Sequence, residues 1–94
     1  MIFNRCLQLV VRGRVQGVYY RAWTKQQADE IGLDGWVRNR RDGSVEAVLD
    51  GTPEDVDEML GRMKAGPPDA SVDTIEIISE GGAAPKGFEV RDTA

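Results

Sequence analysis

The fold is decided by residues 6–50, which read CLQLVVRGRVQGVYYRAWTKQQADEIGLDGWVRNRRDGSVEAVLD. The stretch opens with Cys6–Arg12, where apolar residues recur at every second position. This alternation predicts a strand that carries Leu7, Leu9 and Val11 on one face, because successive residues of a strand point to opposite faces. One face of this first strand is therefore expected to lie in the core.

A loop with two glycines, Gly13–Val18, separates this strand from a predicted helix. The helix is expected to begin at Tyr19 or Tyr20 and to end at Ile31. Its apolar residues at helical spacing are Tyr20, Trp23, Ala28 and Ile31. Gly32 is the expected stop, because glycine readily adopts the left-handed conformation that ends many helices.

Two further strands follow and form a predicted hairpin. The first is Gly35–Asn39, the connection is Arg40–Gly43, and the second is Ser44–Asp50. Asp-Gly, at positions 42 and 43, is among the dipeptides most typical of tight hairpin turns. These two strands are therefore expected to lie side by side and antiparallel.

A second helix is predicted after the hairpin. Thr52 is a candidate N-cap, Pro53 suits the first helical position, and Gly66-Pro67-Pro68 ends the pattern. The core stripe of this helix follows the i, i+3, i+4, i+7 spacing and consists of Val56, Met59, Leu60 and Met63.

Two strands complete the chain. Val72–Ser79 is expected to point Ile75 and Ile77 inward, together with Val72 or one of its neighbours. Phe88–Arg91 is expected to be a short strand at a sheet edge. The resulting order, βαββαβ plus a short C-terminal edge strand, predicts an α+β fold. It is the ferredoxin-like split βαβ sandwich, a mostly antiparallel sheet with two helices on one face. Residues 1–94 are expected to form a single domain.

The predicted topology brings two segments together. In a split βαβ unit the first two strands run parallel with a third strand between them. The loop after the first strand and the carboxyl end of the second then lie at the same end of the sheet, roughly 10 Å apart. Arg21 and Asn39 are expected to reach into this gap from opposite sides and to meet a small ligand there.

The segment Arg14–Tyr20 suits an anion. Gly17 permits a tight turn in which successive N–H groups point at one centre, and the following helix presents unpaired N–H groups. Arg21 adds a charged fork that matches phosphate at two points. An ordinary strand-to-helix turn is the alternative, because the segment lacks the Walker spacing and a following Lys-Ser/Thr pair.

Asn39 has two interpretations as well. Asn is common where a strand enters a turn, which requires no function. The functional interpretation is an amide that orients a water molecule, accepting through its oxygen and donating through its nitrogen.

The chain of 94 residues holds no His and one Cys. These counts exclude Ser-His-Asp and Cys-His catalysis, HExxH zinc sites and an internal disulfide. Carboxylates remain available for Mg²⁺ or Ca²⁺. The net charge is −4, but residues 1–41 hold eight basic and three acidic side chains, and residues 42–94 hold four and thirteen. This distribution favours a local anion site over a general nucleic-acid-binding surface, with chance segregation as the alternative.

A cytoplasmic protein is expected from the single unpaired Cys6, which we interpret as a small apolar residue of the first strand. The opening MIFNRC lacks an apolar signal region, and the longest run without a charge or glycine is far shorter than a membrane span.

Three motifs together carry a resemblance to a known family. They are GRVQGVYYR at Gly13–Arg21, GWVRNRRDGSVE at Gly35–Glu46 and GPPDASV at Gly66–Val72. In this order they strongly resemble acylphosphatases, and the likeness extends from the first strand to Phe88–Val90.

The resemblance implies a ferredoxin-like enzyme that hydrolyses the carboxyl–phosphate bond of acyl phosphates, without metal, organic cofactor or phosphoenzyme. Arg21 matches the phosphate-binding catalytic arginine of the family, and Asn39 matches its water-orienting asparagine. The phosphate cradle corresponds to the backbone of Val15, Gln16, Gly17, Val18, Tyr19 and Tyr20. Tyr20 departs from the family pattern, in which Phe is frequent, and adds a hydroxyl of unknown role.

The chemistry agrees with the absence of histidine. A carboxylate leaving group has a pKa of about 4–5 and departs without protonation, so no general acid is needed. We expect a small-molecule substrate, no nucleic-acid or membrane partner, and a monomer. The alternatives are a ferredoxin-like anion- or RNA-binding module without catalysis, and a detached domain like the one that begins a carbamoyl-transferring hydrogenase maturation protein. The chain length favours a free-standing enzyme over the latter.

Overall fold

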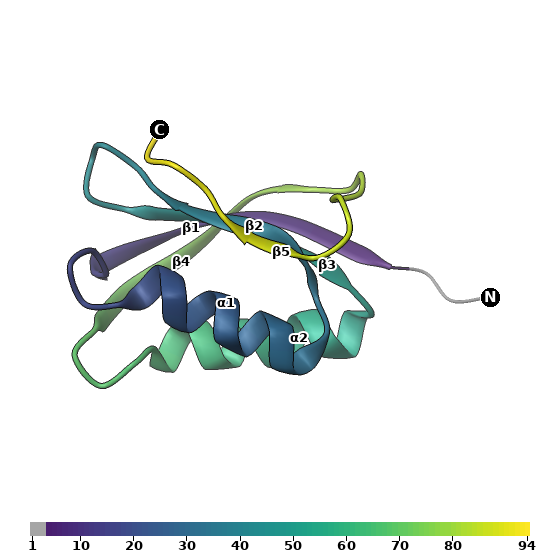
Figure 1. Ribbon diagram of the computed structural model, residues 1–94, viewed down its shortest axis with the longest axis horizontal. Helices are drawn as coiled ribbons and strands as arrows, with labels where there is room; N and C mark the ends of the chain where they lie inside the picture. The colour runs from purple at the N-terminus through teal and green to yellow at the C-terminus, as the bar shows by residue number, and fades with distance from the viewer. Residues whose placement is uncertain (1–3) are drawn as a thin grey trace.

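Seven elements follow one another in the predicted order (Figure 1). The computed structural model describes residues 4–94. In chain order the elements are β1 (Arg5–Arg14), α1 (Tyr20–Ile31), β2 (Asp34–Asn39), β3 (Val45–Gly51), α2 (Pro53–Ala65), β4 (Ser71–Glu80) and β5 (Phe88–Val90). The predicted α+β order is confirmed, and the predicted boundaries shift by at most one or two residues.

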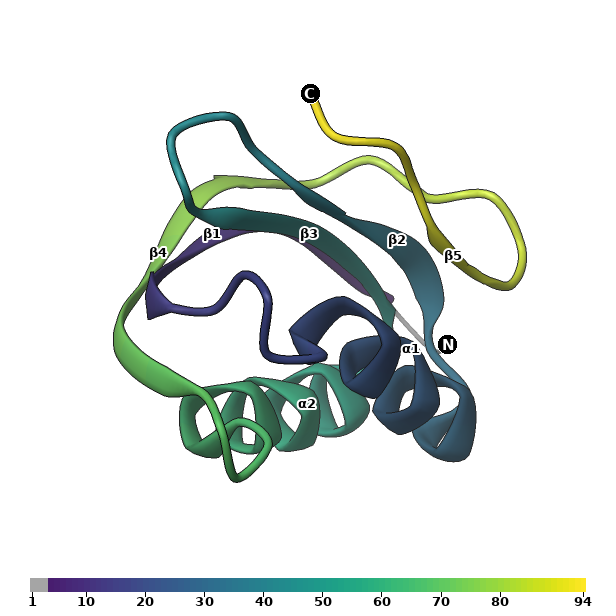
Figure 2. The same cartoon turned by 60° about the vertical axis from the view of Figure 1, so that its left-hand side comes forward.

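One five-stranded sheet, in the order β4-β1-β3-β2-β5, carries both helices on the same face (Figure 2). β3 pairs antiparallel with β1 and with β2, so these two strands run parallel to each other on either side of it. β4 pairs antiparallel with β1, and β5 pairs parallel with β2 at the opposite edge. The ferredoxin-like arrangement therefore places the loop after β1 and the end of β2 at one end of the sheet.

The helix-facing side of the sheet forms the core. Leu7, Leu9 and Val11 of β1 are fully buried there, as their alternation predicts. They belong to one cluster with alternate residues of β3 and the stripe of α2, namely Val45, Ala47, Leu49, Val56, Met59 and Met63. Leu60, the remaining residue of the predicted stripe, is half-buried at the margin of this cluster.

The buried face of α1 includes a polar residue that the apolar spacing does not indicate. Tyr20, Thr24 and Ala28 are buried, whereas Trp23 and Ile31 are half-buried against the core. The Thr24 hydroxyl donates a hydrogen bond of 2.7 Å to the Tyr20 carbonyl. A threonine fits the core here because its one polar group is satisfied within the helix.

The inward set predicted for β4 is partly wrong. Val72 and Ile75 pack against the core, but Ile77 is 47% exposed. Ile77 pairs with Leu9, so it shares the helix-facing side of the sheet, and the register between the two strands shifts next to this pair. Because β4 is an edge strand, Ile77 has a neighbouring strand on one side only, and alternation alone does not reveal that difference.

Candidate active site

A hollow of about 210 Å³ lies at the end of the sheet that the topology singles out. The residues that line it are Val15, Gly17, Tyr19, Tyr20, Arg21, Ala22, Asn39 and Val90. Arg21 from α1 and Asn39 from the end of β2 therefore share one cavity. Of the predicted cradle, residues 15–20, the members Gln16 and Val18 do not line the cavity. Ala22 and Val90 line it without having been predicted.

The cradle leads into an uncapped helix. Tyr19 is the N-cap of α1 and adopts the left-handed conformation, at φ 69° and ψ 16°, without a side-chain cap. The first helical bond is the 3.0 Å contact from the Trp23 amide to the Tyr19 carbonyl. Within residues 4–94, the amides of residues 20–22 donate to no backbone carbonyl outside the helix. This helix end therefore offers unpaired N–H groups and the positive end of the helix dipole to an anion.

Gly17 sets the shape of the cradle through its backbone. Its φ is +73°, and no heavy atom lies within 4 Å of the position that a Cβ would occupy. There is room for a side chain at this position, so the reason for glycine is the left-handed backbone conformation and not a lack of space. With Tyr19, the loop holds two left-handed residues separated by one position, which suits a concave backbone around a small anion.

Gln16 ties the cradle to the β2–β3 connection. Its side-chain amide donates two hydrogen bonds, of 2.7 Å to the Arg40 carbonyl and 2.8 Å to the Ser44 carbonyl. These contacts fix the loop that carries the cradle against the turn that follows Asn39. Gln16 therefore supports the loop without lining the cavity itself. The sequence offers no signal for this role, because it depends on two main-chain oxygens more than twenty residues away.

Arg21 and Asn39 each bring an unsatisfied polar group to the cavity. Among the described residues, four arginines take part in no salt bridge, namely Arg14, Arg21, Arg40 and Arg41, and of these only Arg21 lines the cavity. The Oδ1 atom of Asn39 is buried and has no hydrogen-bond partner within residues 4–94. A buried acceptor without a partner is rare and costly, so its position beside an unpaired cation indicates a site built for a polar ligand.

The hydroxyl of Tyr20 has a hydrogen-bond partner in the core. It donates a 2.7 Å hydrogen bond to the Met63 carbonyl, inside the core and near the end of α2. Burial raises the pKa of this phenol, so the hydroxyl stays protonated. The departure from Phe at this position is therefore explained by a bond that fastens the start of α1 to the end of α2.

Replacing Tyr20 by phenylalanine is expected to lower the free energy of unfolding by about 1–2 kcal/mol, because the buried Met63 carbonyl loses its donor. Chemical denaturation of the two proteins measures the difference. The matched control is Tyr19→Phe, which removes a hydroxyl from a side chain that is 63% exposed and should change stability by less than about 0.5 kcal/mol. Equal stability of Y20F and the unmodified protein would contradict this role.

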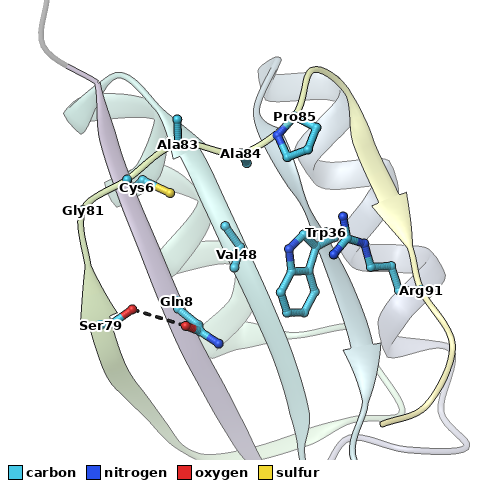
Figure 3. Close-up of a pocket in the computed structure, with 11 residues that line it drawn as sticks. Cys6, Gln8, Trp36, Val48, Ser79, Gly81, Ala83, Ala84, Pro85 and Arg91 are labelled. Carbon is cyan, nitrogen blue, oxygen red and sulfur yellow. Dashed lines mark hydrogen bonds between the residues drawn. The ribbon is translucent and has the colours of Figure 1, made fainter.

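A second hollow, of about 250 Å³, lies on the face of the sheet that the helices do not cover (Figure 3). There the Trp36 ring is in contact with two guanidinium groups, with the Cζ atoms of Arg38 and Arg91 at 4.8 and 4.9 Å from its centroid. Cys6 lines this hollow, and burial together with the charge of Asp50 raises the pKa of its thiol. Because the thiolate is the nucleophilic form, this cavity offers no activated nucleophile.

Two wider searches cover the described part of the chain. Across residues 4–94, no three His, Cys, Asp or Glu side chains are grouped so as to hold a metal ion. In the same residues, neither helix is long and apolar enough to cross a membrane. The fold and the first hollow together define a ferredoxin-like domain whose site combines an uncapped helix end, an unpaired arginine and a neutral amide.

Known proteins share both the sequence and the fold. Residues 7–90 match the sequence model of the Acylphosphatase family. The acylphosphatase of Rhizorhabdus wittichii is 52% identical over 88% of this chain and 84% of its own length. That of Bradyrhizobium diazoefficiens is 56% identical over 80% and 76%. The crystal structure of acylphosphatase from Bacillus subtilis superposes with a TM-score of 0.86, at 31% identity over 95% of this chain and 99% of that one.

The chain belongs to the acylphosphatase family, and it is accordingly a hydrolase of acyl phosphates. Full-length HypF, in its phosphate- and nucleotide-bound form, also shares the fold, with a TM-score of 0.86 at 22% identity. The match covers 99% of this chain but 12% of HypF, so that likeness concerns one part of a much larger protein.

Proposed function

We propose that the cradle and Arg21 bind the phosphoryl group of an acyl phosphate and that Asn39 orients the attacking water. The observation that carries this proposal is the meeting of an unpaired guanidinium and a buried, unpartnered Asn39 Oδ1 atom in one cavity beside an uncapped helix end. The guanidinium and the amides neutralise the phosphoryl oxygens. The Asn39 oxygen accepts a hydrogen bond from water and so points a lone pair of that water at phosphorus.

The bond changes then require little further help from the protein. Water attacks phosphorus, the bond between phosphorus and the bridging oxygen breaks, and the electron pair leaves with the carboxylate. The transition state of phosphoryl transfer is loose, so positioning and charge stabilisation supply most of the rate enhancement. The carboxylate leaves as a stable anion, and the water proton passes to the phosphate product or to solvent.

The same proposal extends to the setting of the reaction. We infer that residues 1–94 act as one monomeric domain in the cytoplasm, on a small-molecule acyl phosphate, with no metal, organic cofactor, phosphoenzyme, nucleic acid or membrane partner. A non-catalytic RNA-binding alternative has less support. Its stacking platform would need free aromatic rings on the open sheet face, where the Trp36 ring already contacts Arg38 and Arg91.

Hydrolysis of acetyl phosphate in the presence of a chelator tests the proposal. The purified protein is expected to release acetate and phosphate at the same rate with and without the chelator, and inorganic phosphate is expected to inhibit competitively. Loss of activity with the chelator, restored by Mg²⁺, would show that carboxylate-bound metal takes part instead. Binding of phosphate without any turnover would favour the binding-module alternative.

A further inference from the structure

Two exposed apolar side chains flank the mouth of the proposed active site. Among residues 4–94, four large apolar side chains are markedly exposed: Tyr19, Val90, Ile77 and Ile78, at 63%, 43%, 47% and 46%. Tyr19 and Val90 both line the hollow that holds Arg21 and Asn39, whereas Ile77 and Ile78 lie on β4, at the other edge of the sheet. Exposed apolar surface next to a polar site indicates a contact surface for an apolar part of a ligand.

Tyr19 occupies a backbone position that disfavours a bulky side chain. It is the one non-glycine residue with positive φ in the described part of the chain. A tyrosine in the left-handed region is strained, and glycine or asparagine would adopt this conformation at lower cost. Gln26 donates a 3.2 Å hydrogen bond to the Tyr19 hydroxyl, so the ring is also held at its far end. The ring therefore lies at the cavity rim, and its position depends on the backbone conformation of Tyr19 more than on this one exposed hydrogen bond.

Val90 reaches the cavity through the pairing of β5 with β2. It is the register partner of Val37, two residues before Asn39, in the parallel pair at the sheet edge. This pairing places an aliphatic side chain beside the strand end that carries the water-orienting amide. Tyr19 is the N-cap of α1 and also lines the cavity, so the two apolar groups come from different parts of the fold.

The lining residues give the cavity one charged part and one apolar part, which suit the two ends of an acyl phosphate. Arg21 is the one charged residue among them, and no acidic residue lines the hollow. The phosphoryl end is satisfied by Arg21 and the helix amides, as proposed above. The remaining wall is apolar, formed by Val15, Ala22, Tyr19 and Val90. A charged acyl group would lose hydration against this wall without gaining a partner.

We propose that Tyr19 and Val90 form the acyl subsite and select substrates with an apolar acyl group, aromatic or branched, over small or charged acyl groups. This inference rests on the proposed function of the same cavity. An aromatic acyl group is expected to gain on the order of tenfold in kcat/KM from this surface, since one added apolar group in a pocket is worth tenfold or more.

The test compares benzoyl phosphate with acetyl phosphate in the unmodified protein and three variants. The measured quantity is the ratio of the two kcat/KM values, in which changes that affect phosphoryl chemistry alone cancel. Val90→Ser and Tyr19→Ala are each expected to lower this ratio about fivefold to tenfold. Tyr19→Phe keeps the ring and should keep the ratio. Ile77→Ser is the matched control, an exposed apolar residue outside the cavity, and should leave the ratio unchanged.

Inhibition by two phosphonates provides a second measurement that needs no turnover. Benzoylphosphonate is expected to bind the unmodified protein more tightly than acetylphosphonate, and V90S should remove most of the difference. Ratios unchanged within twofold in both V90S and Y19A, or equal affinity of the unmodified protein for the two phosphonates, would overturn the acyl subsite. Absence of acetyl phosphate hydrolysis would instead contradict the proposed function, so the two failures are distinct.

Discussion

Replacing Arg21 by alanine is expected to lower kcat/KM for acetyl phosphate about a thousandfold. Arg21 is the one charged residue that lines the cavity in the described part of the chain, and the proposed function assigns the phosphoryl oxygens to its guanidinium. Competitive inhibition by inorganic phosphate should weaken in parallel, since the same group holds substrate and product. Steady-state kinetics with phosphate as inhibitor measures both effects. Arg21→Lys retains the charge without the planar guanidinium, so its activity should lie between that of the unmodified protein and that of R21A.

The matched control for this prediction is Arg14→Ala. Arg14 is also an arginine close to the cradle, but it ends β1, is exposed and does not line the cavity. Its removal is expected to change kcat/KM no more than a few-fold, through a weaker attraction of anions to the surface. Near-normal turnover by R21A, or an equal loss in R14A, would contradict the assigned role of Arg21.

Replacing Asn39 by alanine is expected to separate turnover from binding. The value of kcat should fall about a hundredfold, because water loses the acceptor that orients it. The inhibition constant of phosphate should stay within about twofold, because Arg21 and the helix amides remain. A large rise in that constant would show that Asn39 binds phosphate directly.

Stability gives this second prediction an independent readout. The Asn39 Oδ1 atom is buried without a hydrogen-bond partner in residues 4–94, so its removal deletes no hydrogen bond of that atom to the rest of the described protein. The free energy of unfolding of N39A is therefore expected to equal or exceed that of the unmodified protein. A structural asparagine at a strand end would give the opposite result, because its removal would delete a stabilising contact. Thermal or urea denaturation distinguishes the two.

Much of the architecture could be predicted because it depends on local patterns. The alternation in β1 and the spacing in α2 predict their buried faces, because each pattern places the apolar residues on one face of the element. The meeting of Arg21 and Asn39 follows from strand order alone. In each case the structural outcome depends on a periodicity or a connection that the sequence displays directly.

The remaining features depend on contacts between distant segments. Ile77 has the alternation of an inward residue, but its exposure follows from the edge position of β4. Val90 joins the cavity because β5 pairs parallel with β2, a choice that three residues of strand do not specify. The Gln16 amide and the Tyr20 hydroxyl both donate hydrogen bonds to main-chain carbonyls. Every residue has such a carbonyl, so the sequence does not indicate which residues are the partners.

Hydrolysis of acetyl phosphate in water enriched in heavy oxygen tests the central claim most directly. If water held by Asn39 attacks phosphorus in the cradle, the heavy isotope enters inorganic phosphate, and acetate keeps the oxygens of the substrate. The enzyme-dependent part of the reaction is obtained by subtracting a parallel sample without protein, and mass spectrometry of both products measures the label. The account predicts labelled phosphate and unlabelled acetate. Label in the acetate would show attack at the carbonyl carbon and would contradict it.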